Sequence, residues 1–459
     1  MKQHAPRILI GATASNSGKT TLVCGLLRAL KCRGVNPAAC KCGPDYIDPM
    51  ILRTVIGAES RNLDLFFSSK EDVHRLISQG AKRNDVTVIE GVMGYYDGIA
   101  VRDMASAWDV ARTTETPAVL VINARGRARS IAAEIAGFAQ FREKSQVHGV
   151  ILNRVAPMLY ERLKALIEEE TGIRVYGYLP ALEDASLESR HLGLVTADEV
   201  EDLQQRLDVI ADAVEASVDI EGLLELAQTA PDIEYSIPEL SHVVPAGVEA
   251  PVIALARDDA FCFYYDDALD MLEELGARLV EFSPIADERI PSHASGLYLG
   301  GGYPELHARS LAENESMRAS IAAAIKQGMP TIAECGGFMY LHESIEDESG
   351  ASWPMAGIVK GASYKTARLR RFGYITLEAK EDSLLATKGG VMRAHEFHYW
   401  DSTEAGSAFH ARKPQSERSW ECGVVTPTLY AGYPHLYLYS EPKAAARFVR
   451  ACVEYGTSR

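Results

Sequence analysis

The chain has 459 residues, of which 47% are hydrophobic and 24% charged, and its formal net charge is −16. A length of this order predicts about two to four domains, each able to bury its own core. The acidic balance argues against non-specific binding of nucleic acid, because a phosphate backbone favours a basic surface. Apolar runs are too short to cross a bilayer and the N-terminus does not resemble an export signal, so we expect a cytoplasmic protein with no membrane partner.

The eight cysteines are scattered along the chain. In a chain without an export signal, free thiols are the default. Cys40 and Cys42 are too close together, and too far from other ligands, for a tetrahedral zinc site, so we interpret them as buried small residues.

The first half of the chain alternates short apolar runs with helical patterns. This alternation predicts a mostly parallel sheet covered by helices on both faces. The expected strands are 7–12, 35–41, 86–90, 118–123 and 147–152, and the expected helices are 18–33, 70–82, 104–113, 128–142 and 157–171.

A break in the pattern divides the chain. Residues from about 198 to 227 are helical and acidic, and 228–250 contain three prolines with little periodicity. A second alternation of strand and helix patterns begins at Pro251. We therefore expect an α/β domain over 1–227, a linker over 228–250 and a second α/β domain over 251–459.

The segment Thr13–Thr21, with the sequence TASNSGKTT, follows the apolar run Ile8-Leu9-Ile10 and precedes a helical pattern. A strand, a loop of small residues ending in Gly-Lys-Thr and a helix form a phosphate-binding loop. Its backbone N–H groups can hold phosphates, Lys19 can reach the β- and γ-phosphates, and the Thr20 hydroxyl can hold Mg²⁺. The expected nucleotide-binding residues are Thr13, Ser17, Gly18, Lys19, Thr20 and Thr21.

Two acidic segments follow this loop. Asp45 and Asp48 lie in Gly43–Pro49, where a glycine and two prolines predict a rigid loop at the carboxyl edge of a strand. Glu90 ends the apolar run Val86–Glu90, where phosphate-loop proteins keep a carboxylate for Mg²⁺ or its water, and Asp97 lies in the glycine-rich turn after it. The alternative is that these acids only cap turns and helices.

The motifs ATASNSGKTT, KCGPDYIDP and IEGVMGYYDG, in this order, resemble the cobyrinate a,c-diamide synthases, amidotransferases of corrin biosynthesis related in fold to dethiobiotin synthetase. The resemblance covers the whole chain. It implies a ligase of cobalamin biosynthesis that uses ATP and Mg²⁺ to convert two peripheral carboxylates of a tetrapyrrole into carboxamides.

The resemblance also assigns roles to residues of the first domain. It implies Thr20, Asp48 and Glu90 as Mg²⁺ ligands and Tyr46 and Ile47 as contacts to the corrinoid. The remaining implied residues are Lys19, Asp45 and Asp97 in the chemistry of the ATP site, with Asn153 as a contact to adenine.

Two departures from the family pattern concern this domain. Ala12-Thr13 stands where the family usually has Gly-Thr, and Asn123 stands where the next strand usually ends in Asp, so a metal role at position 123 is not expected. After Asn123 come three alternating arginines, ending in Arg129. Guanidinium groups bind carboxylates in a bidentate manner, so we expect Arg129 to face the substrate; the alternative is a solvated helix start.

In the second half, Cys335 lies between the apolar run at 332–333 and a helical run over 338–341, which predicts the sharp strand-to-helix turn of a nucleophile elbow. Gly300-Gly301-Gly302 ends another strand and can offer backbone N–H groups to an oxyanion, as can Gly336. The expected base is His435.

This half resembles a class I glutamine amidotransferase domain. The resemblance implies that Cys335 attacks glutamine and that ammonia leaves, with His435 moving protons. The usual triad has Glu two residues after His, but here that residue is Tyr437, so the sequence does not show what orients His435. His395 and His398 are spaced for a metal on a helix, but the resemblance makes their segment a strand with His395 near the glutaminase site. The aromatic segment 261–265 either lines a domain interface or belongs to the core.

The predicted fold is therefore two doubly wound α/β domains, an N-terminal phosphate-loop domain like dethiobiotin synthetase and a C-terminal amidotransferase domain with a flavodoxin-like sheet. The expected ligands are ATP, glutamine and a polycarboxylate tetrapyrrole, and we expect a sheltered route for ammonia between the two sites. Cobyrinic acid, hydrogenobyrinic acid and nickel sirohydrochlorin all remain open as substrates, as does, less well, the later multi-amidation catalysed by cobyric acid synthase. A ParA-like nucleotide switch would explain only the first half, and the oligomeric state stays open, a homodimer being one possibility.

Overall fold

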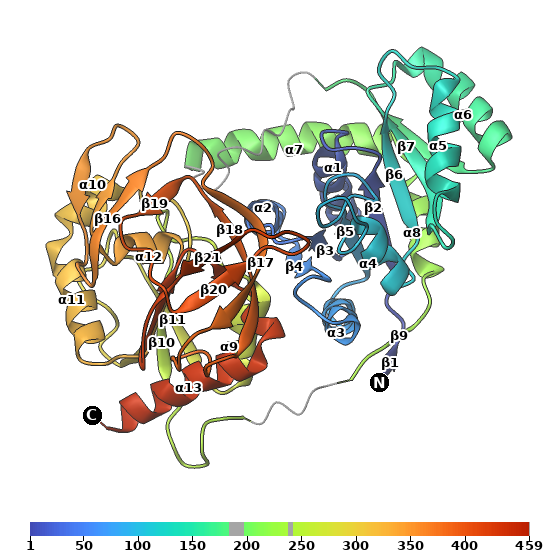
Figure 1. The fold of residues 1–459 in the computed structure, drawn as a ribbon. Coiled ribbons are helices and arrows are strands. Elements are labelled where there is room, and N and C mark those ends of the chain that lie inside the picture. The colour runs from blue at the N-terminus through green and yellow to red at the C-terminus, as the bar shows by residue number, and fades with distance from the viewer. Residues whose placement is uncertain (183–196, 237–241, 459) are drawn as a thin grey trace. The chain divides into compact units, whose positions relative to one another are not determined.

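The computed structural model describes residues 1–182, 197–236 and 242–458. Its contacts divide the chain into two compact units, Met1–Ile237 and Pro238–Arg459. Figure 1 shows that each unit is built around a sheet. In the described ranges, no helix combines the length and apolar character that crossing a membrane requires.

The N-terminal unit contains a seven-stranded sheet in the order β4-β3-β5-β2-β6-β7-β8. Every neighbouring pair in it is parallel. A separate antiparallel pair joins β1 (Lys2–Gln3) to β9 (Ile233–Glu234), the latter inside the range expected as linker. The strands of the large sheet are β2 (Arg7–Ala12), β3 (Pro37–Cys42), β4 (Glu59–Leu63), β5 (Val86–Glu90), β6 (Ala118–Asn123), β7 (Val147–Asn153) and β8 (Arg174–Leu179).

Both faces of this sheet are covered. Ile8 and Ile10 of β2 pack into a core shared with α1, α2, α7 and α8, while Leu9, which points to the opposite face, is also completely buried. This explains the continuous apolar strands in the sequence, since parallel sheets are buried on both sides. The helices are α1 (Lys19–Cys32), α2 (Ile47–Thr54), α3 (Lys70–Ala81), α4 (Ala107–Thr113), α5 (Ser130–Gln140), α6 (Pro157–Thr171), α7 (Ala197–Ser217) and α8 (Ile220–Gln228).

The structure confirms the five expected strands and five expected helices of this half, with small shifts at their ends. The rigid loop expected over Gly43–Pro49 is partly wrong, because α2 begins at Ile47 and Asp48 lies in its first turn. Pro49 does not prevent this helix, since proline is tolerated in a first turn. Strands β4 and β8 were not predicted. In β4 the buried residues Ser60, Arg61 and Asn62 are polar, so the strand has no apolar signature.

The C-terminal unit has a six-stranded sheet in the order β11-β10-β12-β13-β23-β22, in which only the edge strand β22 is antiparallel. This confirms a second doubly wound domain. The strands are β10 (Val252–Ala256), β11 (Arg278–Phe282), β12 (Ala294–Leu299), β13 (Thr331–Glu334), β22 (Val424–Thr426) and β23 (Leu429–Gly432). The helices are α9 (Asp266–Glu274), α10 (Ala308–Glu313), α11 (Glu315–Lys326), α12 (Gly336–Tyr340) and α13 (Pro442–Thr457), with a 3₁₀ turn at Leu438–Ser440.

This unit also contains two smaller sheets that sequence patterns did not reveal. An antiparallel sheet has the order β21-β20-β17-β18-β24, and a mixed four-stranded sheet has the order β15-β14-β16-β19. Strand β18 confirms that the segment with His395 and His398 is extended. The remaining strands are β14 (His342–Glu346), β15 (Ser352–Pro354), β16 (Val359–Lys365), β17 (Arg371–Ala379), β18 (Val391–His398), β19 (Trp400–Ser402), β20 (Phe409–Arg412), β21 (Ser419–Cys422) and β24 (His435–Leu436).

Candidate active sites

The phosphate-binding loop lies between β2 and α1. Gly18 precedes the helix with φ 96°, a left-handed conformation that favours glycine. No side chain caps the helix, which starts with Lys19, Thr20 and Thr21 and has no acidic residue in its first turn. The N–H groups of a helix start have no partner within the helix, so this end of α1 offers donors to an anion.

The Lys19 side chain points into the space above this loop. Its Nζ donates to the carbonyl oxygen of Met93 at 2.6 Å and lies 3.5 Å from that of Ala14. Burial lowers the pKa of Lys19 to about 8, although the negative charge of Glu90 acts in the opposite direction. The ammonium group is therefore held near the loop and is only weakly solvated.

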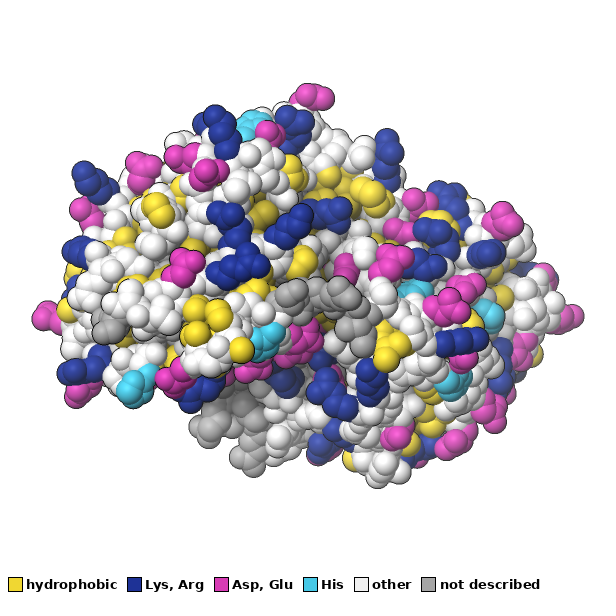
Figure 2. All heavy atoms as spheres, turned by 90° about the horizontal axis from the view of Figure 1, so that it is seen from below, with side chains coloured by type: hydrophobic (Ala, Val, Ile, Leu, Met, Phe, Trp, Pro, Cys, Tyr) yellow, Lys and Arg dark blue, Asp and Glu magenta, His cyan; other side chains and the backbone are white. Residues whose placement is uncertain are grey.

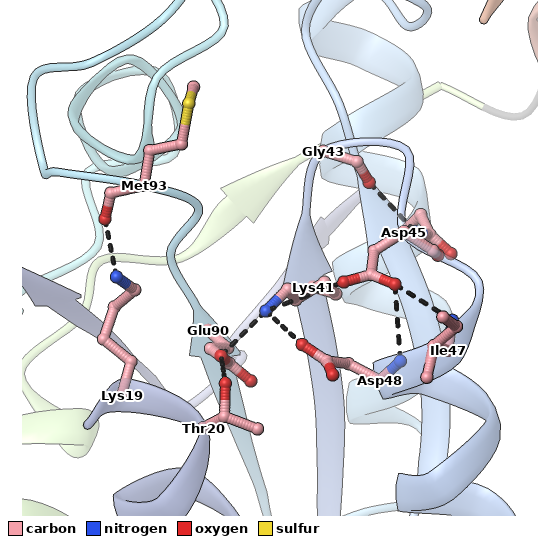
Figure 3. A network of polar contacts seen from close by, with 10 residues as sticks. Lys19, Thr20, Lys41, Gly43, Asp45, Ile47, Asp48, Glu90 and Met93 are labelled. Carbon is pink, nitrogen blue, oxygen red and sulfur yellow. Dashed lines mark hydrogen bonds and ion pairs between the residues drawn. The ribbon is translucent and has the colours of Figure 1, made fainter. Parts of the chain in front are cut away.

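A buried ionic network lies beside Lys19, and its centre is Lys41, the residue before Cys42 on β3 (Figure 3). Lys41 Nζ is 2.5 Å from Asp48 Oδ2 and 2.7 Å from Glu90 Oε1. Burial alone would lower the pKa of Lys41, but the charges of Glu90 and Asp48 outweigh burial and raise it. The Thr20 hydroxyl donates to Glu90 Oε1 at 2.6 Å, so the network is joined to the phosphate loop.

Asp45 lies at the edge of this network. Its Oδ1 accepts hydrogen bonds from the N–H groups of Ile47 and Asp48 at 2.9 and 3.4 Å, and its Oδ2 is 4.0 Å from Lys41 Nζ. Burial, with the neighbouring charge of Asp48, raises the pKa of Asp45 to about 7. Asn62 of β4 holds the loop from behind by donating to the carbonyl oxygens of Gly43 and Asp45.

The same residues provide oxygen ligands of the type that Mg²⁺ prefers. Glu90 Oε2 is buried and makes no hydrogen bond among the described residues, although Oε1 of the same carboxylate has two. Mg²⁺ is commonly bound through one or two carboxylates together with substrate phosphates. The expected ligands Thr20, Glu90 and Asp48 are thus brought together, and they fit such an ion.

The remaining predicted nucleotide residues surround the loop. Asn153, at the end of β7, donates from Nδ2 to the Ser17 carbonyl oxygen at 2.8 Å. A methyl group on Gly18 would meet that Nδ2 at 2.1 Å, which explains the need for glycine there. Asp97 accepts from the Gly94 N–H at 3.1 Å, and its negative charge partly opposes the lowering of the Lys19 pKa that burial causes. Thr13 and Thr21, at either end of the motif, are half-buried.

The three expected substrate contacts are dispersed. Tyr46 and Ile47 are half-buried at the start of α2, next to the ionic network. Arg129 is the residue before α5 and makes no side-chain capping bond to it; its side chain is 76% exposed and pairs with Glu170 of α6. An exposed arginine can exchange such a partner readily, so a substrate role for Arg129 stays a prediction.

In the C-terminal unit, Cys335 forms a strained turn between β13 and α12. Its φ is 47° and its ψ is −100°, outside the regions that residues with a side chain normally occupy. The Cys335 N–H donates to Gly432 O at 2.8 Å and so fixes this conformation. Strain of this kind persists where the surrounding structure imposes it, as in a nucleophile elbow. Burial, with the charge of Glu305, raises the pKa of the Cys335 thiol.

The glycine loop after β12 lies directly against this turn. A methyl group added to Gly336 would meet the Gly302 nitrogen at 3.1 Å, and one added to Gly301 would meet His435 Cε1 at 2.4 Å. The structure thus brings together all three glycines expected to form an oxyanion hole, beside both the elbow and the histidine. Bulkier residues would fill this space.

His435 occupies β24, which pairs with β18 so that His435 lies opposite His395. Its imidazole is 3% exposed, and its Nδ1 is 3.9 Å from Oε2 of Glu334. Burial, with the neighbouring His395 and His398, lowers the pKa of His435 to about 3, and burial raises the pKa of Glu334 to about 8. Tyr437, at the position of the usual triad acid, donates to Asp267 Oδ2 at 3.1 Å.

The His395–His398 segment is not arranged as a metal site. Across the described part of the chain, no group of three His, Cys, Asp or Glu residues is placed to hold a metal ion. Burial lowers the pKa of His395 to about 3 and that of His398 to about 4, and the His398 ring stacks on Tyr433 at 3.9 Å between ring centroids. The aromatic segment 261–265 contributes to the core, since Phe261 is completely buried and contacts Tyr340 edge to face.

Two residues of these sites were not singled out by sequence reasoning. Lys41 and Glu334 each stand directly beside a motif residue that was recognised, Lys41 within KCGPDYIDP and Glu334 before Cys335. A charged residue at the end of an otherwise apolar strand was the available signal in both cases.

On the face of the molecule drawn in Figure 2, acidic and basic side chains are interspersed.

Two protein-family models match the chain, one within each compact unit. Residues 8–195 match the CobQ/CobB/MinD/ParA nucleotide binding domain, and residues 252–443 match the CobB/CobQ-like glutamine amidotransferase domain. The chain therefore joins a nucleotide-binding domain to a glutamine amidotransferase domain.

Curated relatives share this arrangement over nearly their whole length. The cobyrinate a,c-diamide synthase of Caldanaerobacter subterraneus subsp. tengcongensis is 39% identical, with 98% of each chain covered. Those of Listeria innocua and Thermoplasma volcanium are both 38% identical, covering 95% and 99% of this chain and 97% and 99% of their own. The chain belongs to the family of cobyrinate a,c-diamide synthases.

Proposed function

We propose that this protein uses ATP and glutamine to convert the a and c side-chain carboxylates of cobyrinic acid into carboxamides. The observation that carries the proposal is the presence in one chain of two groups of residues: the phosphate loop joined to the Lys41 network, and the strained Cys335 beside the glycine loop and His435. We infer the substrate from the family to which the chain belongs.

In the ATP half-reaction, a substrate carboxylate attacks the γ-phosphate to give an acyl phosphate and ADP. The start of α1 and Lys19 bind the phosphates, and the ammonium groups of Lys19 and Lys41 offset the charge of the transferred group. The Lys41 ammonium group has three N–H donors, of which Asp48 and Glu90 engage two, so we assign the third to orienting the attacking carboxylate. Ammonia then attacks the acyl carbon, the C–O bond breaks, and phosphate leaves.

Thr20, Glu90 and Asp48 would hold Mg²⁺. The ion supplies charge neutralisation at the phosphates when bound. The orphaned oxygen of Glu90 supports this assignment, because a buried carboxylate oxygen without a hydrogen bond is costly unless a ligand satisfies it. We assign Asp45 to positioning Lys41 and Asp97 to positioning Lys19.

In the glutaminase half-reaction, Cys335 Sγ attacks the side-chain amide carbon of glutamine. The backbone N–H groups at Gly302 and Gly336 stabilise the oxyanion, and His435 takes the thiol proton and gives it to the leaving nitrogen. Ammonia and a thioester result, and water then hydrolyses the thioester to glutamate.

Contacts to the macrocycle are assigned to Tyr46, Ile47 and Arg129. The first two begin α2 next to the network, and the third carries an exposed guanidinium group suited to a polycarboxylate. Hydrogenobyrinic acid and nickel sirohydrochlorin present the same two carboxylates and are the alternative substrates. The central metal arrives with the substrate and requires no ligand from the chain.

The test is amide formation by the purified protein on cobyrinic acid with ATP and Mg²⁺, with either glutamine or ammonium as nitrogen donor. Cys335→Ala should lose the glutamine-dependent reaction and keep the ammonium-dependent one. A matched control is Cys32→Ala, which removes an exposed thiol. Hydrolysis of glutamine without amide formation on any of the three macrocycles would contradict the substrate assignment. Absence of glutaminase activity would favour a nucleotide switch.

A further inference from the structure

We infer that Glu334 is the acidic partner of His435, a positioning residue that takes the role of the triad acid missing at position 437. The inference rests on the glutaminase half-reaction proposed above. At the usual position, the Tyr437 hydroxyl is directed to Asp267, and the Tyr437 ring packs edge to face on Tyr265. The residue before the nucleophile, in contrast, faces the histidine.

The two oxygens of the Glu334 carboxyl group have different surroundings. Oε1 accepts a hydrogen bond from the Leu436 N–H at 3.2 Å, so the backbone next to His435 holds this oxygen. Oε2 is the atom 3.9 Å from His435 Nδ1. The Tyr298 hydroxyl also hydrogen-bonds the carboxyl group. With side-chain exposures of 2% and 3%, Glu334 and His435 meet in a site from which water is excluded.

The contact between Glu334 and His435 follows from the way β13 leads into the turn at Cys335. Glu334 is the last residue of β13 and pairs with Gly432 of β23, while Cys335 N donates to Gly432 O at 2.8 Å. The chain then turns through residues 432–435 and returns as β24. Because Glu334 and Cys335 are adjacent, one strand end sets the position of both relative to the imidazole.

The contact supplies what proton transfer at Cys335 requires. As Sγ bonds to the amide carbon, its proton moves to His435 Nε2, and the imidazolium then carries a proton on each nitrogen. Glu334 in its ionised form keeps the proton on Nδ1 of the neutral ring and stabilises the imidazolium that forms. Because burial raises the pKa of Glu334 to about 8, this ionised form gains population as the pH approaches that value. The proton on Nε2 passes to the leaving nitrogen, the C–N bond breaks, and ammonia departs. Burial and the facing His395 and His398 disfavour protonation of His435, so this stabilisation is needed.

Glu334→Gln is the test, with Glu334→Asp and Tyr437→Phe as companions. Glutamine retains an oxygen for the Leu436 N–H but presents an N–H donor to Nδ1, which favours the wrong tautomer of His435. We expect the glutaminase kcat of Glu334→Gln to fall about 100-fold or more, with KM for glutamine within about twofold. Glu334→Asp should recover part of kcat, and Tyr437→Phe should stay near wild type. Imidazole ¹⁵N shifts should show the His435 tautomer reversed in Glu334→Gln alone.

The outcomes separate this inference from the proposed function. An inactive wild type overturns both, because there is then no proton transfer to support. An active wild type with an unchanged kcat in Glu334→Gln overturns the inference and leaves the proposed function intact. Equal losses in Glu334→Gln and Glu334→Asp, with a raised KM and an unchanged His435 tautomer, would show a purely structural role and also overturn it.

Discussion

Lys41 and Asp48 form a buried ion pair with 2.5 Å between Nζ and Oδ2, their side chains being 7% and 9% exposed. They are seven positions apart in the sequence, but they belong to different elements, β3 and α2. The same ammonium group binds Glu90. Removing it would leave two carboxylates close together with little solvent.

We therefore expect Lys41→Met to destabilise the N-terminal unit by about 3–5 kcal/mol, the usual cost of breaking a buried ion pair. The matched control is Lys2→Met, because Lys2 is 63% exposed and lies 3.6 Å from Asp232. That change should cost less than about 1 kcal/mol. Urea unfolding followed by hydrogen exchange in β3 and β5 measures both. Adding Glu90→Gln to Lys41→Met should restore part of the loss, and equal stability of the two single variants would contradict the prediction.

The ATP site should depend on the charge of Lys19. Lys19→Met is expected to lower ammonium-dependent amidation by about 100-fold or more, because it removes a donor that stabilises the transferred phosphate. Glutaminase activity measured without ATP should stay within about twofold of wild type. A comparable loss of both activities would contradict the division of the chemistry between two sites.

The pH dependence of ATP use follows from the same residue. Burial lowers the pKa of Lys19 to about 8, so the free enzyme loses this positive charge as the pH rises above that value. We expect kcat/KM for ATP to fall with pH above about 8, approaching tenfold per unit. In Lys19→Arg, whose guanidinium stays protonated, the decline should be absent between pH 7 and 9. Identical profiles for the two proteins would exclude Lys19 as the titrating group.

Asn153 should tune the affinity for nucleotide by holding the phosphate loop. Asn153→Ala removes the neutral hydrogen bond to Ser17 O, worth about 1 kcal/mol, so KM for ATP should rise about fivefold. Asn36→Ala, which removes an exposed hydrogen bond to Arg83 O, is the control and should leave KM for ATP unchanged. An unaltered KM in Asn153→Ala would show that the loop keeps its shape without this contact.

The free energy of unfolding of the N-terminal unit should depend on pH because of Asp45. Burial raises its folded-state pKa to about 7, above its ordinary value of 3.8, so the folded state binds the proton more tightly than the unfolded state. The resulting stabilisation is full below about pH 4 and disappears as the pH rises through about 7. In Asp45→Asn this decline should be reduced, as measured by hydrogen exchange in β3 between pH 5 and 8. An unchanged pH dependence would contradict the prediction.

The local pattern of the sequence was sufficient to predict most of the elements that carry the chemistry. The run before Thr13, the Gly-Lys-Thr of the loop and the turn at Cys335 are short-range features, in which neighbouring residues determine strand, turn and helix start. Tertiary structure decided the rest. Strand β4 has almost no apolar residues and is recognisable only from its pairing with β3. Lys41 and Glu90 are 49 residues apart, and Glu334 reaches His435 across a hundred residues of chain. These contacts depend on which strand ends meet at one edge of a sheet, and strand order is set by packing of the whole domain, which no local pattern encodes.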